Sequence, residues 1–220
     1  MILGISGRIS SGKDTVGQII QYLTDESINK FYTFEQWAVE TYNGQDTTKW
    51  QIKKFAAKMK QCVSIITGIP VEDLENIDVK NSLIGKDWGD ITYRKLLQLL
   101  GTEVGRCILP DFWINALFSR YTKTALNWDV DGNTTVEAYP NWIITDCRFE
   151  NEIKAIYIRG GITIRLQRNS QTVSSDHTSE TALDNYSNFD YFVDNSNTTI
   201  NELIQIVKNI LIIEQIITKD

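Results

Sequence analysis

The sequence predicts an α/β protein whose parallel β-sheet is covered by helices on both faces. Short apolar segments alternate with segments of helical periodicity along most of the 220 residues. The first apolar segment is followed at once by a glycine-rich turn and a helix, an arrangement typical of nucleotide-binding folds. The length fits one domain with an inserted subdomain. A chain this long buries roughly 70% of its unfolded surface, so it needs no disulfide or structural metal.

The N-terminal segment supplies the first strand, turn and helix. Residues 1–6 are an apolar run, and from Lys13 onward apolar side chains recur at helical spacing. Between them lies GRISSGKDT, which nearly matches the phosphate-loop pattern G-x-x-x-x-G-K-[ST]. The departure is Asp14, a carboxylate where the pattern has a hydroxyl, with Thr15 following one residue late.

The middle of the chain is predicted to be mostly helical. Residues 25–48 are polar and aromatic, and Asn43-Gly44 is a turn signal. A strand is expected within 50–55, and a helix over 56–66 that ends before Gly68 and Pro70. The remaining helices of this region are expected at 92–108 and, after Pro110-Asp111, through Phe118.

The last third alternates strands and helices again. Asp131-Gly132 indicates a surface hairpin within 127–140. Thr199 and Glu202 form a capping-box pattern that opens the last helix. The other expected elements are strands at 142–146, 162–167 and 191–194, a helix from 149 to the Gly160-Gly161 pair, and a short helix over 179–185.

Composition narrows the class of protein. Hydrophobic residues make up 42% and charged residues 23%, as in globular proteins. The net charge of −6 argues against a partner made of polymeric nucleic acid. The sequence contains no run of 18 apolar residues, so it predicts no membrane-spanning helix. The three cysteines are Cys62, Cys107 and Cys147, an odd and scattered set that indicates reduced thiols, so we expect a cytoplasmic location. With His177 as its one histidine, the chain offers no zinc pattern.

The loop Gly7–Thr15 carries the first chemical prediction. Glycines allow consecutive N–H groups to point inward at phosphate oxygens, and the following helix adds its positive end. Lys13 would then reach the β- and γ-phosphates of a nucleotide. The alternative is a plain glycine-rich turn with a solvated lysine. Asp14 has two interpretations that the sequence leaves open: a contact to Mg²⁺, directly or through water, or a first-turn acid that favours the helix end.

Two further segments place polar side chains where they could bind a metal or a phosphate. In WIITDCRFENE the strand ends at Asp146, the position of an acid that holds Mg²⁺, and Arg148 follows at the same sheet edge. Otherwise Asp146 would be a helix N-cap and Arg148 a surface side chain. In TYRKLLQLLGTEVGR, Arg94 and Gln98 share a helix face. Arg94 and Arg106 suit a monophosphate, and Gln98 suits a base edge, although an ordinary solvated helix face would look the same.

The segment QRNSQTVSSDHTSETALD places Arg168 before a polar loop. An arginine in this position suits the neutralisation of charge on a transferred phosphoryl group. His177 needs no role, because positioning and charge carry most phosphoryl transfers without a general base.

Taken together, these segments resemble the bacteriophage deoxynucleoside monophosphate kinases. The resembling pieces, in chain order, are GRISSGKDT, FAAKMK, YRKLLQLLGTEVGR, ITDCRFENE, GGITIRLQR, SDHTSETALD and YFVDNSNTTINEL. The pair Q-x-L-G-T-E-x-x-R and D-x-R-F-x-N-E is more specific than the phosphate loop alone. The shifted threonine of Gly-Lys-Asp-Thr also fits nucleoside monophosphate kinases. S-E-x-x-L-D within SETALD is shared with phosphomevalonate kinases.

The resemblance implies a P-loop kinase fold and the reaction ATP + dNMP → ADP + dNDP with Mg²⁺. The core would comprise 1–55 and 141–220, a helical subdomain at about 56–122 would bind the monophosphate, and 168–180 would form a lid. Catalysis would depend on Lys13, Arg148 and Arg168, and the metal on Asp14 and Asp146. The donor would contact Gly7, Arg8, Ser10, Ser11, Gly12, Lys13, Asp14, Thr15 and Asn195, and the acceptor Lys60, Arg94, Gln98, Thr102, Glu103, Arg106, Trp113 and Glu180.

Two other functions stay open at this point. The S-E-x-x-L-D motif keeps a non-nucleotide acceptor, of the phosphomevalonate kind, under consideration. A protein that binds nucleotide without turnover would carry the same loop. The sequence leaves undecided which bases are accepted, whether the protein is a homodimer, and whether the cytoplasm is that of a phage host.

Overall fold

The structure, a computed structural model, divides into two compact units that are described separately below. Unit 1 comprises Met1–Lys53 and Thr122–Asp220, and unit 2 comprises Lys54–Tyr121. The residues described are 1–25, 31–42, 48–127, 135–168 and 178–219. The predicted helical subdomain at 56–122 lies almost wholly in unit 2, and its role in binding a monophosphate stays a prediction.

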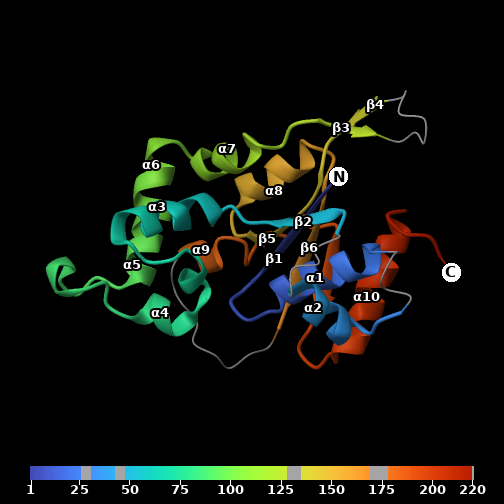
Figure 1. The fold of residues 1–220 in the computed structure, drawn as a ribbon, viewed down its shortest axis with the longest axis horizontal. Coiled ribbons are helices and arrows are strands. Elements are labelled where there is room, and N and C mark those ends of the chain that lie inside the picture. The colour runs from blue at the N-terminus through green and yellow to red at the C-terminus, as the bar shows by residue number, and fades with distance from the viewer. Residues whose placement is uncertain (26–30, 43–47, 128–134, 169–177, 220) are drawn as a thin grey trace. The chain divides into compact units, whose positions relative to one another are not determined.

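Unit 1 is built on a five-stranded sheet in the order β2-β5-β1-β6-β7, in which every neighbouring pair is parallel (Figure 1). The predicted α/β class with a parallel sheet is therefore confirmed. The strands of the sheet are β1 (Ile2–Gly7), β2 (Trp50–Lys53), β5 (Asn141–Cys147), β6 (Ile162–Gln167) and β7 (Tyr191–Asp194). The helices of unit 1 are α1 (Lys13–Thr24), α2 (Phe34–Tyr42), α8 (Glu150–Tyr157), α9 (Thr178–Thr181) and α10 (Ile200–Ile213).

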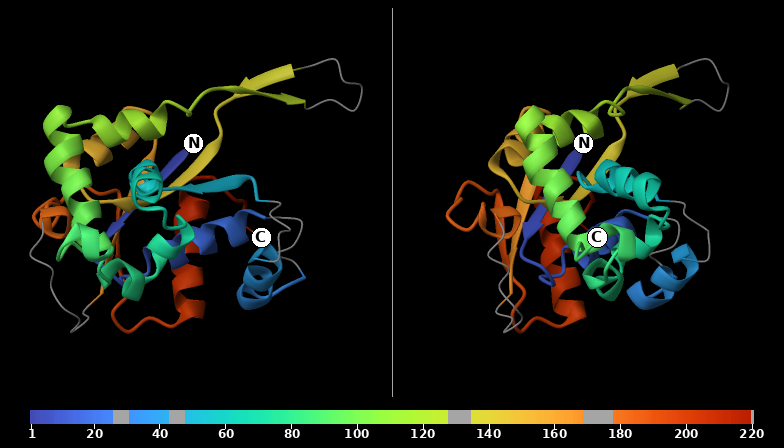
Figure 2. Two further views of the ribbon diagram at one scale, coloured as in Figure 1. Left: turned by 60° about the vertical axis from the view of Figure 1, so that its left-hand side comes forward. Right: turned by 90° about the vertical axis from the view of Figure 1, so that its left-hand side faces the viewer.

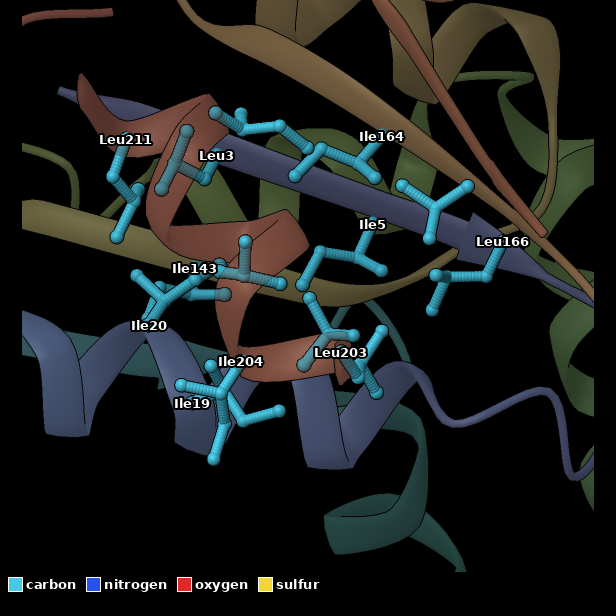
Figure 3. Packing of buried hydrophobic residues seen from close by; sticks show 14 of the residues in the cluster. Leu3, Ile5, Ile19, Ile20, Ile143, Ile164, Leu166, Leu203, Ile204 and Leu211 are labelled. Atoms are coloured by element: carbon cyan, nitrogen blue, oxygen red, sulfur yellow. The ribbon is translucent and has the colours of Figure 1, made fainter. Parts of the chain in front are cut away.

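Alternation along β1 explains how both faces of the sheet are covered. Leu3 and Ile5 point to the face packed by α1 and α10, where they join one apolar cluster with side chains of β5 and β6 (Figure 3). Gly4 faces the other way, and a Cβ there would lie 2.4 Å from Ile156 of α8. A glycine at this position therefore lets α8 pack close against the second face.

Helix α10 begins as predicted. Thr199 Oγ1 accepts from the backbone N–H of Glu202, and Glu202 accepts from the backbone N–H of Thr199, so the capping box is confirmed. Its predicted apolar face is also confirmed, since Leu203, Val207 and Leu211 are buried.

Helix α2 was not predicted. Thr33 and Gln36 cap it reciprocally, with Gln36 Oε1 2.9 Å from the Thr33 nitrogen, and its Phe34 and Trp37 are buried. The T-x-x-Q pattern is a helix-start signal that the surrounding polar residues obscure. The Asn43-Gly44 turn lies outside the described residues.

The predicted hairpin is present as β3 (Thr124–Asn127) paired antiparallel with β4 (Thr135–Ala138). Figure 2 shows this two-stranded ribbon extending outward beyond the start of β5. Its Asp131-Gly132 turn lies outside the described residues. No helix in the described part of the chain is long and apolar enough to cross a bilayer.

Unit 2 is helical, as predicted. Its small core brings Val63, Leu74 and Leu97 together. The predicted helix over 92–108 is interrupted by a π-helical segment, η3 (Leu99–Gly105), a rare feature that is frequent at functional sites. The remaining elements are α3 (Ala57–Thr67), η1 (Glu72–Glu75), α4 (Ile77–Asn81), η2 (Lys86–Trp88), α5 (Tyr93–Gln98), α6 (Arg106–Ile108) and α7 (Phe112–Phe118).

Candidate active site

The loop between β1 and α1 has two residues at positive φ. Ser10 has φ 61° and Gly12 has φ 98°, both in the left-handed region that L-residues rarely adopt. The Ser11 nitrogen donates to the Arg8 carbonyl at 3.2 Å and closes the turn. A non-glycine residue held at positive φ costs about 1–3 kcal/mol, and such strain clusters at ligand-binding positions. The strained backbone therefore favours a ligand-binding loop over an ordinary glycine-rich turn.

Ser11 places a buried polar atom inside this loop. Its hydroxyl oxygen is buried and has no hydrogen-bond partner within the part of the chain that the structure describes. A Cβ added at Gly7 would lie 2.4 Å from that oxygen, so only glycine leaves the space beside it open. An unsatisfied buried polar group costs about 1–3 kcal/mol. A ligand oxygen at this point would remove that cost.

Asn195 fixes the far side of the loop. Its Nδ2 donates to the Ser11 carbonyl at 3.0 Å, and the residue is buried at the end of β7. The sequence placed Asn195 near the donor nucleotide. The contact observed is with the loop that would hold the phosphates.

Lys13 turns back into the loop. Its ammonium donates to the Arg8 carbonyl at 2.6 Å. Burial, together with the positive charge of the nearby Arg148, lowers the pKa of Lys13 to about 8, although Asp14 and Asp146 oppose the shift. A bound anion would stabilise the charged form of a lysine that is desolvated and lies beside another positive charge.

Asp14 and Asp146 are the two predicted metal ligands. The hydroxyl of Thr145, on β5, donates to Asp14 Oδ1 at 2.7 Å, and Asp14 sits in the first turn of α1. Asp146 follows Thr145 and is partly buried. Among the described residues no group of three or more His, Cys, Asp or Glu is placed to hold a metal. Mg²⁺ usually takes only one or two carboxylates together with phosphate oxygens and water, so these two residues fit it.

Four arginines of unit 1 are held by polar partners. Arg148 forms an ion pair with Glu180. Arg8 and Arg165 both bind Asp184, and Arg165 also donates to the hydroxyl of Ser6 at 2.8 Å. Arg168 donates to the Ser10 carbonyl at 3.3 Å. The predicted short helix is smaller than expected, α9 ending at Thr181, and residues 169–177 of the predicted lid, with His177, lie outside the described residues.

Unit 2 contains a second cluster of basic side chains. The buried Lys60 forms an ion pair with Glu75, and Lys54 lies 3.7 Å from the same carboxylate. Lys80 lies near this cluster. Burial and the positive charges of Lys60, Arg94 and Lys54 lower the pKa of Lys80 to about 8, although Glu75 opposes the shift. Arg94 donates to Asn81 Oδ1 at 2.7 Å. The structure thus brings together Lys60 and Arg94 from the predicted acceptor set.

The other predicted acceptor residues lie along α5, η3, α6 and α7. Arg106 donates to the Pro110 carbonyl at 3.2 Å, and the buried Trp113 donates its indole N–H to the Gly101 carbonyl at 2.9 Å. Gln98 and Thr102 are partly buried and Glu103 is exposed. Their roles, and that of Glu180 toward an acceptor, stay predictions.

Sequence reasoning missed four residues that hold these clusters: Lys54, Glu75, Lys80 and Asp184. The signal for Asp184 was present, because Glu180 and Asp184 stand four apart in S-E-x-x-L-D. Glu75 and Lys80 lie in a stretch of short helices where no periodicity marks them.

Comparison with known families supplies an independent observation. The family model described as deoxynucleotide monophosphate kinase matches residues 45–207, well over half of the chain. No curated protein matches. The matched span begins after the phosphate loop, so the loop and the family match support each other without sharing residues. Neither a phosphomevalonate-type acceptor nor binding without turnover is supported. The chain belongs to the deoxynucleotide monophosphate kinase family, whose activity is the phosphorylation of deoxynucleotide monophosphates.

Proposed function

We propose that the phosphoryl donor is ATP, bound with Mg²⁺ by the loop Gly7–Thr15. The observation that carries the proposal is the buried Ser11 hydroxyl, which has no hydrogen-bond partner among the described residues. It lies in a loop whose strained backbone and Lys13 suit phosphate oxygens. The start of the 12-residue helix α1 directly after the loop adds a positive dipole end.

The residues around the loop would stabilise the negative charge that develops during phosphoryl transfer. In the transfer an acceptor phosphate oxygen bonds to the γ-phosphorus while the bond to the β,γ-bridging oxygen breaks. Negative charge spreads over the transferred group and the leaving ADP. Lys13, Arg148 and Arg168 would neutralise this charge. Lys13 would exchange the Arg8 carbonyl for a phosphate oxygen, and Arg168 already contacts the loop at Ser10.

Asp146 and Asp14 would hold the metal, whose contribution when bound is to neutralise charge on the phosphates. The donor set is two carboxylates at the sheet edge, which leaves room for phosphate oxygens and water.

For the acceptor, we propose that Lys60 and Arg94 hold the monophosphate. Lys60 is buried and Arg94 is aligned by Asn81, so both are positioned before a ligand binds. Arg106 is the third candidate for this phosphate, while Gln98, Thr102, Glu103 and Trp113 are assigned to sugar and base. Arginine and lysine suit a phosphate dianion through charge-assisted hydrogen bonds.

We further propose a cytoplasmic location, in a phage host if the chain is phage-encoded. All three cysteines are free, which fits a reducing compartment. A homodimer remains a prediction.

The experiment is a donor and metal panel. ADP release is measured with dGMP, dTMP, dCMP and dAMP as acceptors, ATP or GTP as donor, and Mg²⁺ present or removed by EDTA. We expect turnover with MgATP, its loss in EDTA, and its return on adding Mg²⁺. Turnover with GTP but not ATP, or full activity in EDTA, would contradict the proposal.

A further inference from the structure

The S-E-x-x-L-D motif lies within a short segment that forms ion pairs with three arginines. Thr178–Thr181 form α9, and Leu183 beyond it is buried and anchors the segment. Glu180 and Asp184 are spaced i,i+4 on this segment. Glu180 pairs with Arg148, and Asp184 pairs with Arg8 and Arg165.

The three arginines come from the three segments that surround the phosphate loop. Arg8 lies in the loop itself, Arg148 follows β5, and Arg165 lies on β6 next to β1. One seven-residue segment therefore connects the loop to the two strands that flank β1.

Asp184 has two different relationships with its arginines. The Arg165 side chain is 11% exposed, donates to Asp184 at 3.2 Å and stacks on Phe189, so it needs the carboxylate as a counter-charge. The Arg8 side chain is 56% exposed and donates to Asp184 at 2.5 Å and 3.4 Å. An exposed pair adds little to stability, so the effect of Asp184 on Arg8 is mainly orientation.

Arg8 in turn holds the catalytic lysine. Its carbonyl accepts from the Lys13 ammonium at 2.6 Å and from the Ser11 nitrogen at 3.2 Å. A side chain fixed at Asp184 limits how far this carbonyl can move. The contacts thus run from Asp184 through Arg8 to Lys13 and Ser11.

We propose that Asp184 is a positioning residue for phosphoryl transfer, which holds the phosphate loop through Arg8, and that Glu180 does the same for Arg148. The inference rests on the proposed donor site. The S-E-x-x-L-D motif is then explained by its two carboxylates and by the leucine that anchors them, without any contact to an acceptor.

A double-mutant cycle tests the proposal. We measure kcat, the KM for ATP, and Tm for wild type, Asp184→Asn, Arg8→Gln and the double variant. A lost charged hydrogen bond corresponds to roughly a tenfold effect or more. We expect Asp184→Asn to lower kcat/KM for ATP about tenfold in wild type but less than about threefold in the Arg8→Gln background. Asp184→Glu should recover part of the loss.

The controls separate positioning from folding. Asp184→Asn also leaves the buried Arg165 without its counter-charge, so a lower Tm is expected, whereas Arg8→Gln keeps the Arg165–Asp184 pair and should keep the wild-type Tm. Glu150→Gln, which removes an exposed pair with Lys154, should leave kcat/KM unchanged. An equal loss in both backgrounds, or no loss in either, would overturn the proposal. If wild type shows no turnover with ATP, the proposed donor site itself is wrong.

Discussion

The two units hold their positive charge in different ways. In unit 1, Arg8, Arg148 and Arg165 each form an ion pair with a carboxylate of the segment 178–184. In unit 2, Lys54 and Lys60 share the carboxylate of Glu75, and Lys80 lies beside them. The first arrangement supplies two carboxylates for three arginines, whereas the second supplies one carboxylate for three lysines. The second leaves cations crowded, so that a bound phosphate would relieve their repulsion.

This difference separates the expected kinetic effects. Groups fixed in place around a donor contribute most where charge develops, so their loss should lower kcat. Groups that gather an anion contribute to binding, so their loss should raise the acceptor KM. Variants in the two units should therefore be distinguishable in one assay.

Lys13→Ala should have the largest effect. Removing one charge-stabilising donor typically lowers kcat about 100- to 1000-fold. The fold should not suffer, because the lowered pKa of Lys13 shows that burial disfavours its charged form. Steady-state kinetics and thermal unfolding check both statements, with Lys154→Ala on α8 as the control. A variant that melts many degrees below wild type would show that Lys13 is structural.

Lys60→Gln should affect the acceptor more than the chemistry. The loss of a buried charged hydrogen bond is expected to raise the dNMP KM roughly 10- to 100-fold, with a smaller change in kcat. Lys58→Gln, on the same helix and bonded to Gln61, is the matched control. An unchanged KM for dNMP together with a lower kcat would contradict the expectation that the basic residues of unit 2 act on acceptor binding.

Lys80 gives the comparison a pH dependence. The pKa of Lys80 is about 8 in the folded protein and 10.5 for an unperturbed lysine, so between these pH values the unfolded chain binds more protons. The contribution of Lys80 to stability therefore rises with pH through this window, and below pH 8 its charge is unfavourable. The main cause of the lowered pKa is burial, followed by the positive charges of Lys60, Arg94 and Lys54, while Glu75 opposes the shift.

Lys80→Gln should accordingly raise Tm by about 1–3 °C at pH 7, and this advantage should vanish near pH 10. Thermal unfolding at both pH values measures it, with the exposed Lys95→Gln as control. A lower Tm at pH 7 would mean that Lys80 is stabilised by its surroundings.

The sheet could be predicted from the sequence because its strands carry their own signals. The runs at 142–146, 162–167 and 191–194 are short, apolar and bounded by polar or turn residues, and each is a strand. The π-helical segment at Leu99–Gly105 could not be predicted, since its apolar spacing also satisfies an α-helix. Helix α2 depends on a capping pair, Thr33 and Gln36, that periodicity does not detect.

The candidate site was predictable only where residues are close in sequence. The loop Gly7–Thr15 is one continuous pattern, and so is the pair Asp146 and Arg148. Asp184 reaches Arg8 across 176 positions, and Glu75 reaches Lys60 across 15. Such pairs are created by the fold, and no spacing rule in one sequence reveals them.

Thr145→Val should have the smallest effect, and it addresses the role of Asp14. The Thr145 hydroxyl is buried and donates to Asp14 Oδ1, which ties the first turn of α1 to β5. Valine keeps the shape and removes the donor, so we expect a loss of about 1 kcal/mol, or 2–4 °C in Tm, with kcat within about twofold of wild type. Because Asp14 is proposed to hold the metal and this hydrogen bond orients its carboxylate, we also expect the Mg²⁺ concentration for half-maximal activity to rise about two- to fivefold. An unchanged Mg²⁺ requirement would instead make Asp14 a first-turn acid that acts at the helix end alone.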